Sequence, residues 1–537
     1  MAITMISAAK FPLVFAFLCF ALALAGCSSS SAPPTFTIGG TVVNLASAGG
    51  VVLQNGGQTL TVTANGSFTF AMPAKSLSLY SVTIAQQPTS PAQICGVTNG
   101  SGMVAGNVTN VEVNCGHNEW AWTNGSSTAN GVAVYGSLGI PAAGNTPGAR
   151  QSPATWTDNS GNFWLFGGRA FIAKDYSPTN DLWEYSGGQW VWVGGLNGSG
   201  ASGVYGTLGV PSASNVPGSR WEAVTWTDST GNLWLLGGTG LDSAGTQGDL
   251  NDLWKYSGGE WTWMGGSNLV NQQGSYGTLG VTAEGDFPGA RHGALGWVDS
   301  SGNFWLFGGI GLDVAGTMQG MFNDLWKYSS GEWTWVSGSD LKDQAAVYGT
   351  MGAAAPTNVP GARCSLSGWV DSSGGLWLFG GDTFSGMLND LWKFSNGEWT
   401  WVSGANTAGQ GGIYGVRGTP GAGNLPGARQ LAVSWTDRAG NFWLFGGNGP
   451  DSAANEGLLN DLWKYSNGQW TWVSGSNIVD QSGAYGTQGI LAPANIPGAR
   501  IEAESFIDAS GNLWLFGGYG VVPNSDTNFN DLWMYMP

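Results

Sequence analysis

Charged side chains are scarce in this chain, because Asp, Glu, Lys and Arg make up 9% of its 537 residues. A surface helix normally carries charged residues along its outer face, so the scarcity argues against a helical protein. The 17 basic residues are outnumbered by 34 acidic ones, which gives a formal net charge of −17. Nucleic acids and anionic lipid surfaces both attract basic proteins, so we expect neither as a partner.

Histidine and cysteine, which supply most metal ligands and many nucleophiles, are also rare. His117 and His292 are the two histidines, and the five cysteines do not have the spacing of a zinc site. We therefore expect no metal and no cofactor.

Glycine and tryptophan, by contrast, are abundant, with 91 and 30 residues. Many glycine turns, many aromatic residues and few charges are typical of an all-β protein. A chain of this length exceeds one ordinary hydrophobic core, so we expect more than one domain.

The first 26 residues read as a signal peptide. Lys10 precedes an apolar run from Phe11 to Ala25, which is short for a membrane span. The run ends in Leu24-Ala25-Gly26-Cys27, which resembles the lipobox of bacterial lipoproteins. That resemblance implies cleavage before Cys27 and lipid attachment to its thiol, with a plain secretory signal as the alternative. Ser28 rather than aspartate follows, which in Gram-negative lipoproteins favours the outer membrane or cell surface.

Export would place the mature chain in an oxidising compartment, where disulfides persist. Cys19 would leave with the signal peptide and Cys27 would be lipidated. We predict that Cys95 and Cys115 form a disulfide, because they lie in one small segment, and that Cys364 stays a thiol.

Residues 27–35 are rich in serine and proline and predict a flexible tether. Residues 36–116 predict a small β-sandwich, with Asn65-Gly66 as a hairpin turn between runs 60–63 and 67–70. The segment is similar to transthyretin-like and carboxypeptidase-regulatory-like modules. We interpret it as a spacer between the membrane and the main domain.

Residues 117–537 repeat one unit six times, with a period of 66 to 72 residues. The anchors are Pro-Gly-(Ala/Ser)-Arg, an apolar strand ending in Gly-Gly, Asn-Asp-Leu-Trp, and Trp-x-Trp. An insert with Tyr-Gly precedes each Pro-Gly-(Ala/Ser)-Arg. The anchor arginines are Arg150, Arg220, Arg291, Arg363, Arg429 and Arg500.

Each unit reads as four strands, which predicts a propeller blade, and the anchors resemble those of the kelch family. The series begins with a fourth strand at Trp120-Ala121-Trp122 and ends with a third strand at Trp533. Pairing these two ends would close the ring and remove two exposed strand edges. The sequence therefore predicts an all-β fold: a six-bladed kelch-like β-propeller, preceded by the small β-sandwich.

Twenty-nine of the 30 tryptophans fall on repeated positions, which favours packing between blades over a single ligand site. The repeated arginines have two interpretations. In kelch adaptors, arginines at this place reach the ring mouth and contact acidic ligands, and the resemblance implies the same role here. The alternative is that each arginine pairs with a repeated acid such as Asp181 or Asp252.

Enzyme interpretations find little support. Resemblance to the galactose oxidase propeller implies two histidine and two tyrosine ligands for copper, and neither His117 nor His292 lies in such a pattern. A glycosidase needs two carboxylates facing each other, and Glu222, Glu502 and Glu504 are the carboxylates near an arginine anchor. Asp242, Asp313 and Asp451 lie in loops and are candidates for calcium ligands, with solvated loop acids as the alternative.

The connections from strand 4 to 1 and from 2 to 3 are the long ones, so one face of the ring should carry most of the loops. Trp221, outside the repeated set, follows Arg220 near that face, with Glu222 and His292 as polar partners for a ligand. The alternative is that Trp221 fills a gap under the Tyr-Gly insert. We predict a monomeric protein- or glycan-binding lipoprotein, held to the membrane only through its lipid, with a copper-oxidase or sugar-processing enzyme as the alternative.

Overall fold

In the computed structural model, residues 33–46, 50–89, 93–116, 118–172, 175–314, 316, 319–522 and 525–537 are described. Every regular element in these residues is a β-strand, as the composition predicted, and none of them is helical. No helix in this part of the chain is therefore long and apolar enough to cross a membrane. The predicted signal peptide, Cys27, most of the tether and His117 lie outside the described residues.

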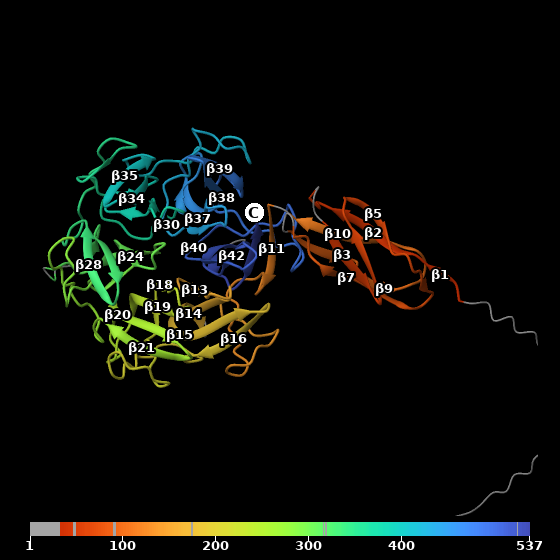
Figure 1. Cartoon of the computed structure of the whole chain (residues 1–537), viewed down its shortest axis with the longest axis horizontal. Coiled ribbons are helices and arrows are strands. Elements are labelled where there is room, and N and C mark those ends of the chain that lie inside the picture. Colours follow the sequence, from red (N-terminus) through yellow and green to blue (C-terminus); the bar gives the residue numbers. More distant parts are fainter. Residues whose placement is uncertain are drawn as a thin grey trace, which may run out of the picture.

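The N-terminal part consists of two four-stranded sheets that share one hydrophobic core, together with the short pair β1-β6 (Figure 1). One sheet has the order β5-β2-β10-β8, with β10 parallel to β2, and the other has the order β4-β3-β7-β9. The strands are β1 (Thr35–Phe36), β2 (Ile38–Val43), β3 (Val51–Asn55), β4 (Gln58–Val62), β5 (Gly66–Thr69), β6 (Ala74–Lys75), β7 (Leu79–Gln86), β8 (Ile94–Thr98), β9 (Ser101–Met103) and β10 (Val108–Gly116).

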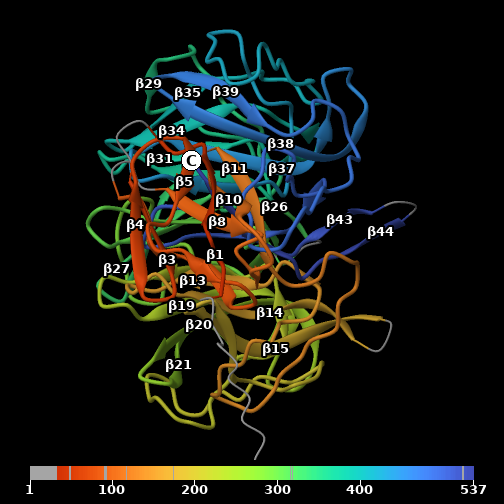
Figure 2. The ribbon, with the colours of Figure 1, turned by 90° about the vertical axis from the view of Figure 1, so that its right-hand side faces the viewer.

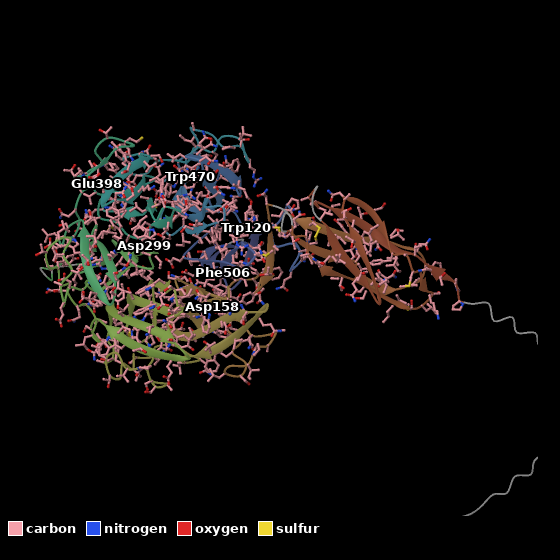
Figure 3. The ribbon with its side chains drawn as sticks, viewed as in Figure 1. Trp120, Asp158, Asp299, Glu398, Trp470 and Phe506 are labelled. Carbon is pink, nitrogen blue, oxygen red and sulfur yellow. A yellow bond between two sulfur atoms is a disulfide. The ribbon has the colours of Figure 1, made fainter. Side chains whose placement is uncertain are left out.

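The predicted disulfide is confirmed, because Cys95 of β8 and Cys115 of β10 lie opposite each other and are bonded. Cys364 is a buried free thiol, also as predicted. Beside the disulfide, the Asn114 side-chain amide donates to the carbonyl of Leu491 at 3.1 Å, which links this part to the main ring near Trp120 (Figure 3).

The predicted Asn65-Gly66 hairpin is wrong. The run before it, β4, pairs with β3, and the run after it, β5, pairs with β2 of the other sheet. Asn65 instead exchanges two hydrogen bonds with the backbone of Leu45, at 2.7 and 2.8 Å. The chain therefore crosses from one sheet to the other at this point. The side-chain amide of Asn65 bonds to the backbone of Leu45, in place of the backbone of a neighbouring strand.

Most of the remaining strands of the described chain form six antiparallel sets of four, here called units 1 to 6, and three of these sets carry a short fifth strand. From the inner to the outer strand they are β13 (Ala154–Thr157), β14 (Phe163–Ile172), β15 (Asp175–Ser186), β16 (Gln189–Gly194); β18 (Val224–Thr227), β19 (Leu233–Leu241), β20 (Gln247–Ser257), β21 (Glu260–Gly265); β23 (Leu295–Val298), β24 (Phe304–Phe307), β27 (Leu325–Ser329), β28 (Glu332–Ser337); β30 (Ser367–Val370), β31 (Leu376–Phe379), β34 (Leu391–Ser395), β35 (Glu398–Ser403); β36 (Val433–Thr436), β37 (Phe442–Pro450), β38 (Glu456–Ser466), β39 (Gln469–Ser474); and β41 (Glu504–Ile507), β42 (Leu513–Phe516), β45 (Leu532–Met536), β11 (Glu119–Asn124).

Short strands flank these sheets, mostly where the anchor arginines and the 2-to-3 connections lie. They are β12 (Arg150–Gln151), β17 (Arg220–Trp221), β22 (Arg291–His292), β25 (Ile310–Gly311), β26 (Gly320–Met321), β29 (Ala354–Ala355), β32 (Asp382–Thr383), β33 (Gly386–Met387), β40 (Arg500–Ile501), β43 (Tyr519–Val522) and β44 (Ser525–Asn528).

The six units surround a common centre in a propeller-like arrangement (Figure 1). The inner strands contact one another in the cyclic order β13, β18, β23, β30, β36, β41 and back to β13. In unit 6 the outer strand comes from the start of the repeat region, because β11 pairs antiparallel with β45, and Trp122 lies opposite Trp533. The strand exchange predicted from the sequence is therefore present.

The hydrophobic core is divided among the gaps between units. One buried cluster joins Phe166 and Leu182 of unit 1 to Leu235 and Trp254 of unit 2, and similar clusters lie between the following units. The six tryptophans of the Asn-Asp-Leu-Trp anchors are fully buried. Their positions fit the packing interpretation of the repeated tryptophans.

The two faces of the ring differ. Turns between the first and second strands are tight, as where Asp158 Oδ1 accepts from the backbone N–H groups of Ser160 and Asn162 at 2.8 and 2.9 Å. On the other face the 2-to-3 connections are longer, and the hairpins β14–β15 and β43–β44 extend beyond the sheets in Figure 2. This side, with the Tyr-Gly inserts, is called the loop-rich face.

Candidate functional site

The anchor arginines are buried in ion pairs with the aspartates of the Asn-Asp-Leu-Trp motif. In unit 1, Arg150 donates from Nη1 and Nη2 to the two carboxylate oxygens of Asp181, at 2.9 and 2.8 Å. Its remaining bonds go to the carbonyls of Gly148 and Gly167, at 3.1 and 2.8 Å. The other pairs are Arg220–Asp252, Arg291–Asp324, Arg363–Asp390, Arg429–Asp461 and Arg500–Asp531.

Each of these aspartates also accepts from two aromatic side chains. Asp181 Oδ2 accepts from the Trp183 indole at 2.7 Å and from the hydroxyl of Tyr135, the Tyr-Gly residue, at 3.0 Å. The repeated motifs thus assemble one buried polar cluster per unit. The geometry matches the ion-pair interpretation of the arginines, whose side chains are at most 2% exposed, so we do not include them in the binding surface.

The centre of the ring holds a polar cavity of about 240 Å³. Its lining includes Glu222 from unit 2, together with Glu502 and Glu504 from unit 6. Thr155 Oγ1 donates to Glu504 Oε2 at 3.0 Å, whereas Glu502 Oε2 is buried with no hydrogen-bond partner in the described chain. The three glutamates singled out in the sequence are therefore brought together around one space.

A cyclic set of backbone hydrogen bonds frames this cavity. The residue two positions after each anchor arginine has a positive φ, between 48° and 63°. Its N–H donates to the carbonyl of the equivalent residue in the preceding unit, over 2.8 to 3.4 Å, until the cycle closes. The six residues are Ser152, Glu222, Gly293, Ser365, Leu431 and Glu502. A left-handed backbone conformation is uncommon for residues other than glycine. Here the cyclic hydrogen bonds stabilise that conformation in five such residues.

Burial raises the pKa of the carboxyls in the cavity. Desolvation raises the pKa of Glu504 to about 8, opposed by its hydrogen bond from Thr155. Desolvation also raises the pKa of Glu502 to about 7, and the charge of Glu222 acts in the same direction. Near neutral pH the cavity therefore holds a mixture of protonated and ionised carboxyls, which can donate as well as accept hydrogen bonds.

These shifts predict that the protein loses stability as the pH rises from 5 to 8. Both carboxyls keep their protons to a higher pH in the folded chain than in the unfolded chain, where they ionise near pH 4.5. The free energy of unfolding, measured by denaturant titration, should fall over this interval. The Glu502→Gln/Glu504→Gln variant should show a smaller fall, and an equal fall in both proteins would contradict the burial of these groups.

His292 lies beside the cavity in a network of its own. Its Nδ1 is 2.8 Å from Asp249 Oδ1, and Asp249 also accepts from Gln319 and Thr239. Desolvation lowers the pKa of His292, but the bond to Asp249 outweighs it and the pKa is raised. The same histidine lowers the pKa of Glu222, which desolvation raises overall. Asp249 thus favours the protonated form of the imidazole, which is held next to the acidic cavity.

Trp221 is half-buried, so it is neither a free platform nor a core residue. The guanidinium of Arg169 lies 5.6 Å from the centre of its ring. Arg169 also lowers the pKa of Glu222 and of Glu502. The sequence predicted one site for Trp221, Glu222 and His292, and the structure places them near one another. We call this site the mouth and define it by Arg169, Trp221, Glu222, Asp249, His292, Glu502 and Glu504.

Arg169 and Asp249 were not predicted, although the sequence contains a signal for each. Asp249 stands where the other units have Pro178, Met321, Met387, Leu458 and Asn528, so it departs from the repeat. Arg169 likewise pairs with Gln151 at a position that differs in every unit. Arg169 and Asp249 belong to the mouth only because the fold brings the 2-to-3 connections of separate units close together.

The loop acids Asp242, Asp313 and Asp451 are buried, so the solvated alternative is wrong. Asp242 Oδ1 accepts from the backbone N–H groups of Ala244 and Thr246, at 2.8 and 2.9 Å, and Asp451 does the same in its own loop. These two carboxylates stabilise turns. In the described part of the chain, no group of three or more His, Cys, Asp or Glu residues is placed to hold a metal ion.

Cys364 is the residue of unit 4 that corresponds to Trp221 and His292. Desolvation raises the pKa of its thiol to about 11. The thiol is therefore protonated at neutral pH and does not serve as a nucleophile at the mouth.

No protein-family model matches this chain, and neither does any curated protein. Among solved structures, the chain is similar to one titled "Structure of YjhT". The two are 13% identical, with a TM-score of 0.43, and the match covers 74% of this chain and 96% of that one.

Proposed function

We propose that this chain is a ligand-recognition protein of the cell envelope, which binds a protein or a glycan through its loop-rich face. In this proposal residues 1–26 are a signal peptide, Cys27 carries the lipid, residues 27–35 are a tether, residues 36–116 form a β-sandwich spacer, and residues 117–537 form a six-bladed kelch-type β-propeller. The protein is a monomer, and its lipid holds it to the membrane, in the outer membrane or at the cell surface.

The observation that carries the proposal is the contrast between repeated and unrepeated residues. The residues that repeat in every unit, such as Arg150, Asp181 and Trp183, are buried and bonded to one another. The residues that differ between units, among them Glu222 and His292, converge at the mouth. A rigid scaffold that presents unrepeated side chains at one place is typical of a binding protein.

The mouth favours ligands with donors or positive charge. Four of its seven side chains are carboxyls, and one of them, Glu502, has a buried oxygen without a partner. Hydroxyl groups of a sugar, or the ammonium groups of a basic peptide, would satisfy these acceptors. Trp221 offers part of an indole face at the edge of the same site.

Binding to a glycan array and to a basic peptide array tests the proposal. The mature chain should bind members of at least one array, and Glu222→Gln/Glu502→Gln should weaken that binding about tenfold or more, because two acceptors lose their charge. The matched control is Glu332→Gln, an exposed glutamate at the start of the outer strand β28.

Trp221→Ala should lower the free energy of unfolding by about 1 kcal/mol, since the Trp221 ring is partly exposed and stacked on one guanidinium.

Absence of binding on both arrays would contradict the proposal. So would binding that Glu332→Gln weakens as much as the mouth variant does, because the ligand would then lie on another surface.

A sugar-processing enzyme remains the second candidate, and one observation favours it. Glu504, with a pKa raised to about 8, lines the same cavity as Glu222. A carboxyl that is protonated at neutral pH and a second carboxyl across the same space are what acid–base hydrolysis of a glycosidic bond requires. Incubating the glycans that bind with the protein, followed by mass spectrometry, separates the candidates. Shortened glycans that Glu504→Gln does not produce would establish the enzyme.

A further inference from the structure

Unit 4 differs from its neighbours in the length of its 2-to-3 connection. Six residues lie between Gly381 and Leu388, whereas eleven lie between Gly238 and Leu250 in unit 2. In unit 2 the longer hairpin contacts the following insert, because Asp242 Oδ2 accepts from Val270 N and Ser243 N donates to the carbonyl of Asn268. The hairpin of unit 5 makes the equivalent contacts through Asp451 and Ser452.

In unit 4 the short hairpin β32–β33 leaves an open space between itself and the following insert. A cavity of about 530 Å³ lies there, between the hairpin and the inserts on either side of it. Its apolar lining includes Phe384, Leu388 and four alanines, and its polar lining includes Gln344, Thr383, Ser385, Asn406 and Thr407. The volume is within the range of pockets that enclose small ligands.

Phe384 is the clearest sign that the cavity binds something. It sits at the tip of the hairpin and is 86% exposed, the most exposed of the large apolar side chains described. Burying it in the fold would stabilise the protein, and the hairpin instead presents it to solvent beside a pocket. The face of its ring is electron-rich and attracts the weakly positive C–H groups of a sugar ring.

The charges of the pocket exclude an acidic ligand. Arg363, the cationic residue of the lining, is buried and holds Asp390 at 2.7 Å. Asp343 adds an exposed carboxylate that accepts from Met321 N. An aromatic face beside hydroxyl and amide groups, with no positive charge offered to the ligand, is complementary to an uncharged sugar.

From these observations we propose that the unit 4 pocket binds one sugar ring of a neutral glycan, stacked on Phe384 and hydrogen-bonded by the neighbouring amides and hydroxyls. The inference rests on the proposed binding function but places this subsite in unit 4, away from the mouth. Asn406 and Gln344, both exposed at the rim, are the amides that would contact sugar hydroxyls.

The test is a glycan array that contains neutral oligosaccharides together with uronic-acid, sialylated and sulfated ones, probed with the mature chain. Neutral members should bind. For the strongest of them, calorimetry should show an affinity about tenfold lower for Phe384→Ala and retained for Phe384→Trp, with melting unchanged because the side chain is exposed. Val416→Ala, a substitution of another exposed apolar residue, is the matched control and should bind as the wild type does.

Three results would overturn the inference: no neutral glycan bound, binding confined to acidic glycans, or equal affinity of Phe384→Ala and the wild type. The mouth variant Glu222→Gln/Glu502→Gln separates this failure from that of the proposed function. Binding that falls in the mouth variant but not in Phe384→Ala would support the mouth and reject the unit 4 pocket.

Discussion

Replacing Asp461 by alanine should lower the free energy of unfolding by about 3 to 5 kcal/mol, because it leaves a buried guanidinium without its counter-charge. Asp461 accepts from Arg429 through both oxygens, at 2.7 and 2.9 Å. It also accepts from the Tyr414 hydroxyl and the Trp463 indole, each at 2.7 Å. All these donors would lose a partner in a region closed to water. Urea titration followed by tryptophan fluorescence measures the change.

The matched control is Glu456→Ala, which removes an exposed carboxylate from the same strand, β38. It should change the free energy of unfolding by about 0.5 kcal/mol or less. If Asp461→Ala lowered the free energy of unfolding as little as Glu456→Ala does, the buried ion pairs would not stabilise the units.

Removing the N-terminal strand of the ring should have a still larger effect. A chain that starts at Thr123 lacks most of β11, and with it Trp120, which is 1% exposed and packs on Phe445, Trp533 and Tyr535. Burial of one tryptophan, roughly 200 Å², corresponds to about 5 kcal/mol, and whole domains are stable by only about 5 to 15 kcal/mol. We expect this chain to lose cooperative thermal unfolding and to aggregate through the exposed edge of β45.

A chain that starts at Gly116 keeps all of β11 and provides the comparison. It should unfold in a cooperative transition close to that of the mature protein, since it loses only the N-terminal sheets. A sharp and unshifted transition in the chain that starts at Thr123 would show that β11 does not close the ring.

The sequence was a good guide to the scaffold because the scaffold repeats. Six copies of Pro-Gly-(Ala/Ser)-Arg and of Asn-Asp-Leu-Trp left two interpretations of the arginines open. One of them was a pairing such as Arg220 with Asp252, which the structure contains at 2.7 Å. The phase of the repeats predicted the pairing of β11 with β45. Residues at equivalent positions of the repeats lie at equivalent positions of the sheets. These features could therefore be predicted from the sequence alone.

The mouth was less predictable because its residues come from connections that lie far apart in the sequence. His292 was predicted, but its partner Asp249 belongs to the preceding unit, and no local pattern joins them. The Asn65-Gly66 turn failed for a related reason: a hairpin signal says nothing about which upstream strand is free to pair. In unit 4, Phe384 stands out only after the hairpins of the other units are compared in space.

The most direct test of a ligand at the mouth is hydrogen–deuterium exchange of the mature protein, with and without the strongest ligand from the arrays. We expect slower exchange in segments 150–153, 220–223, 291–294 and 500–504, where the cyclic hydrogen bonds and the mouth side chains lie. Protection confined to the tight turns of the opposite face, such as 158–161 and 299–302, would contradict a binding site at the mouth.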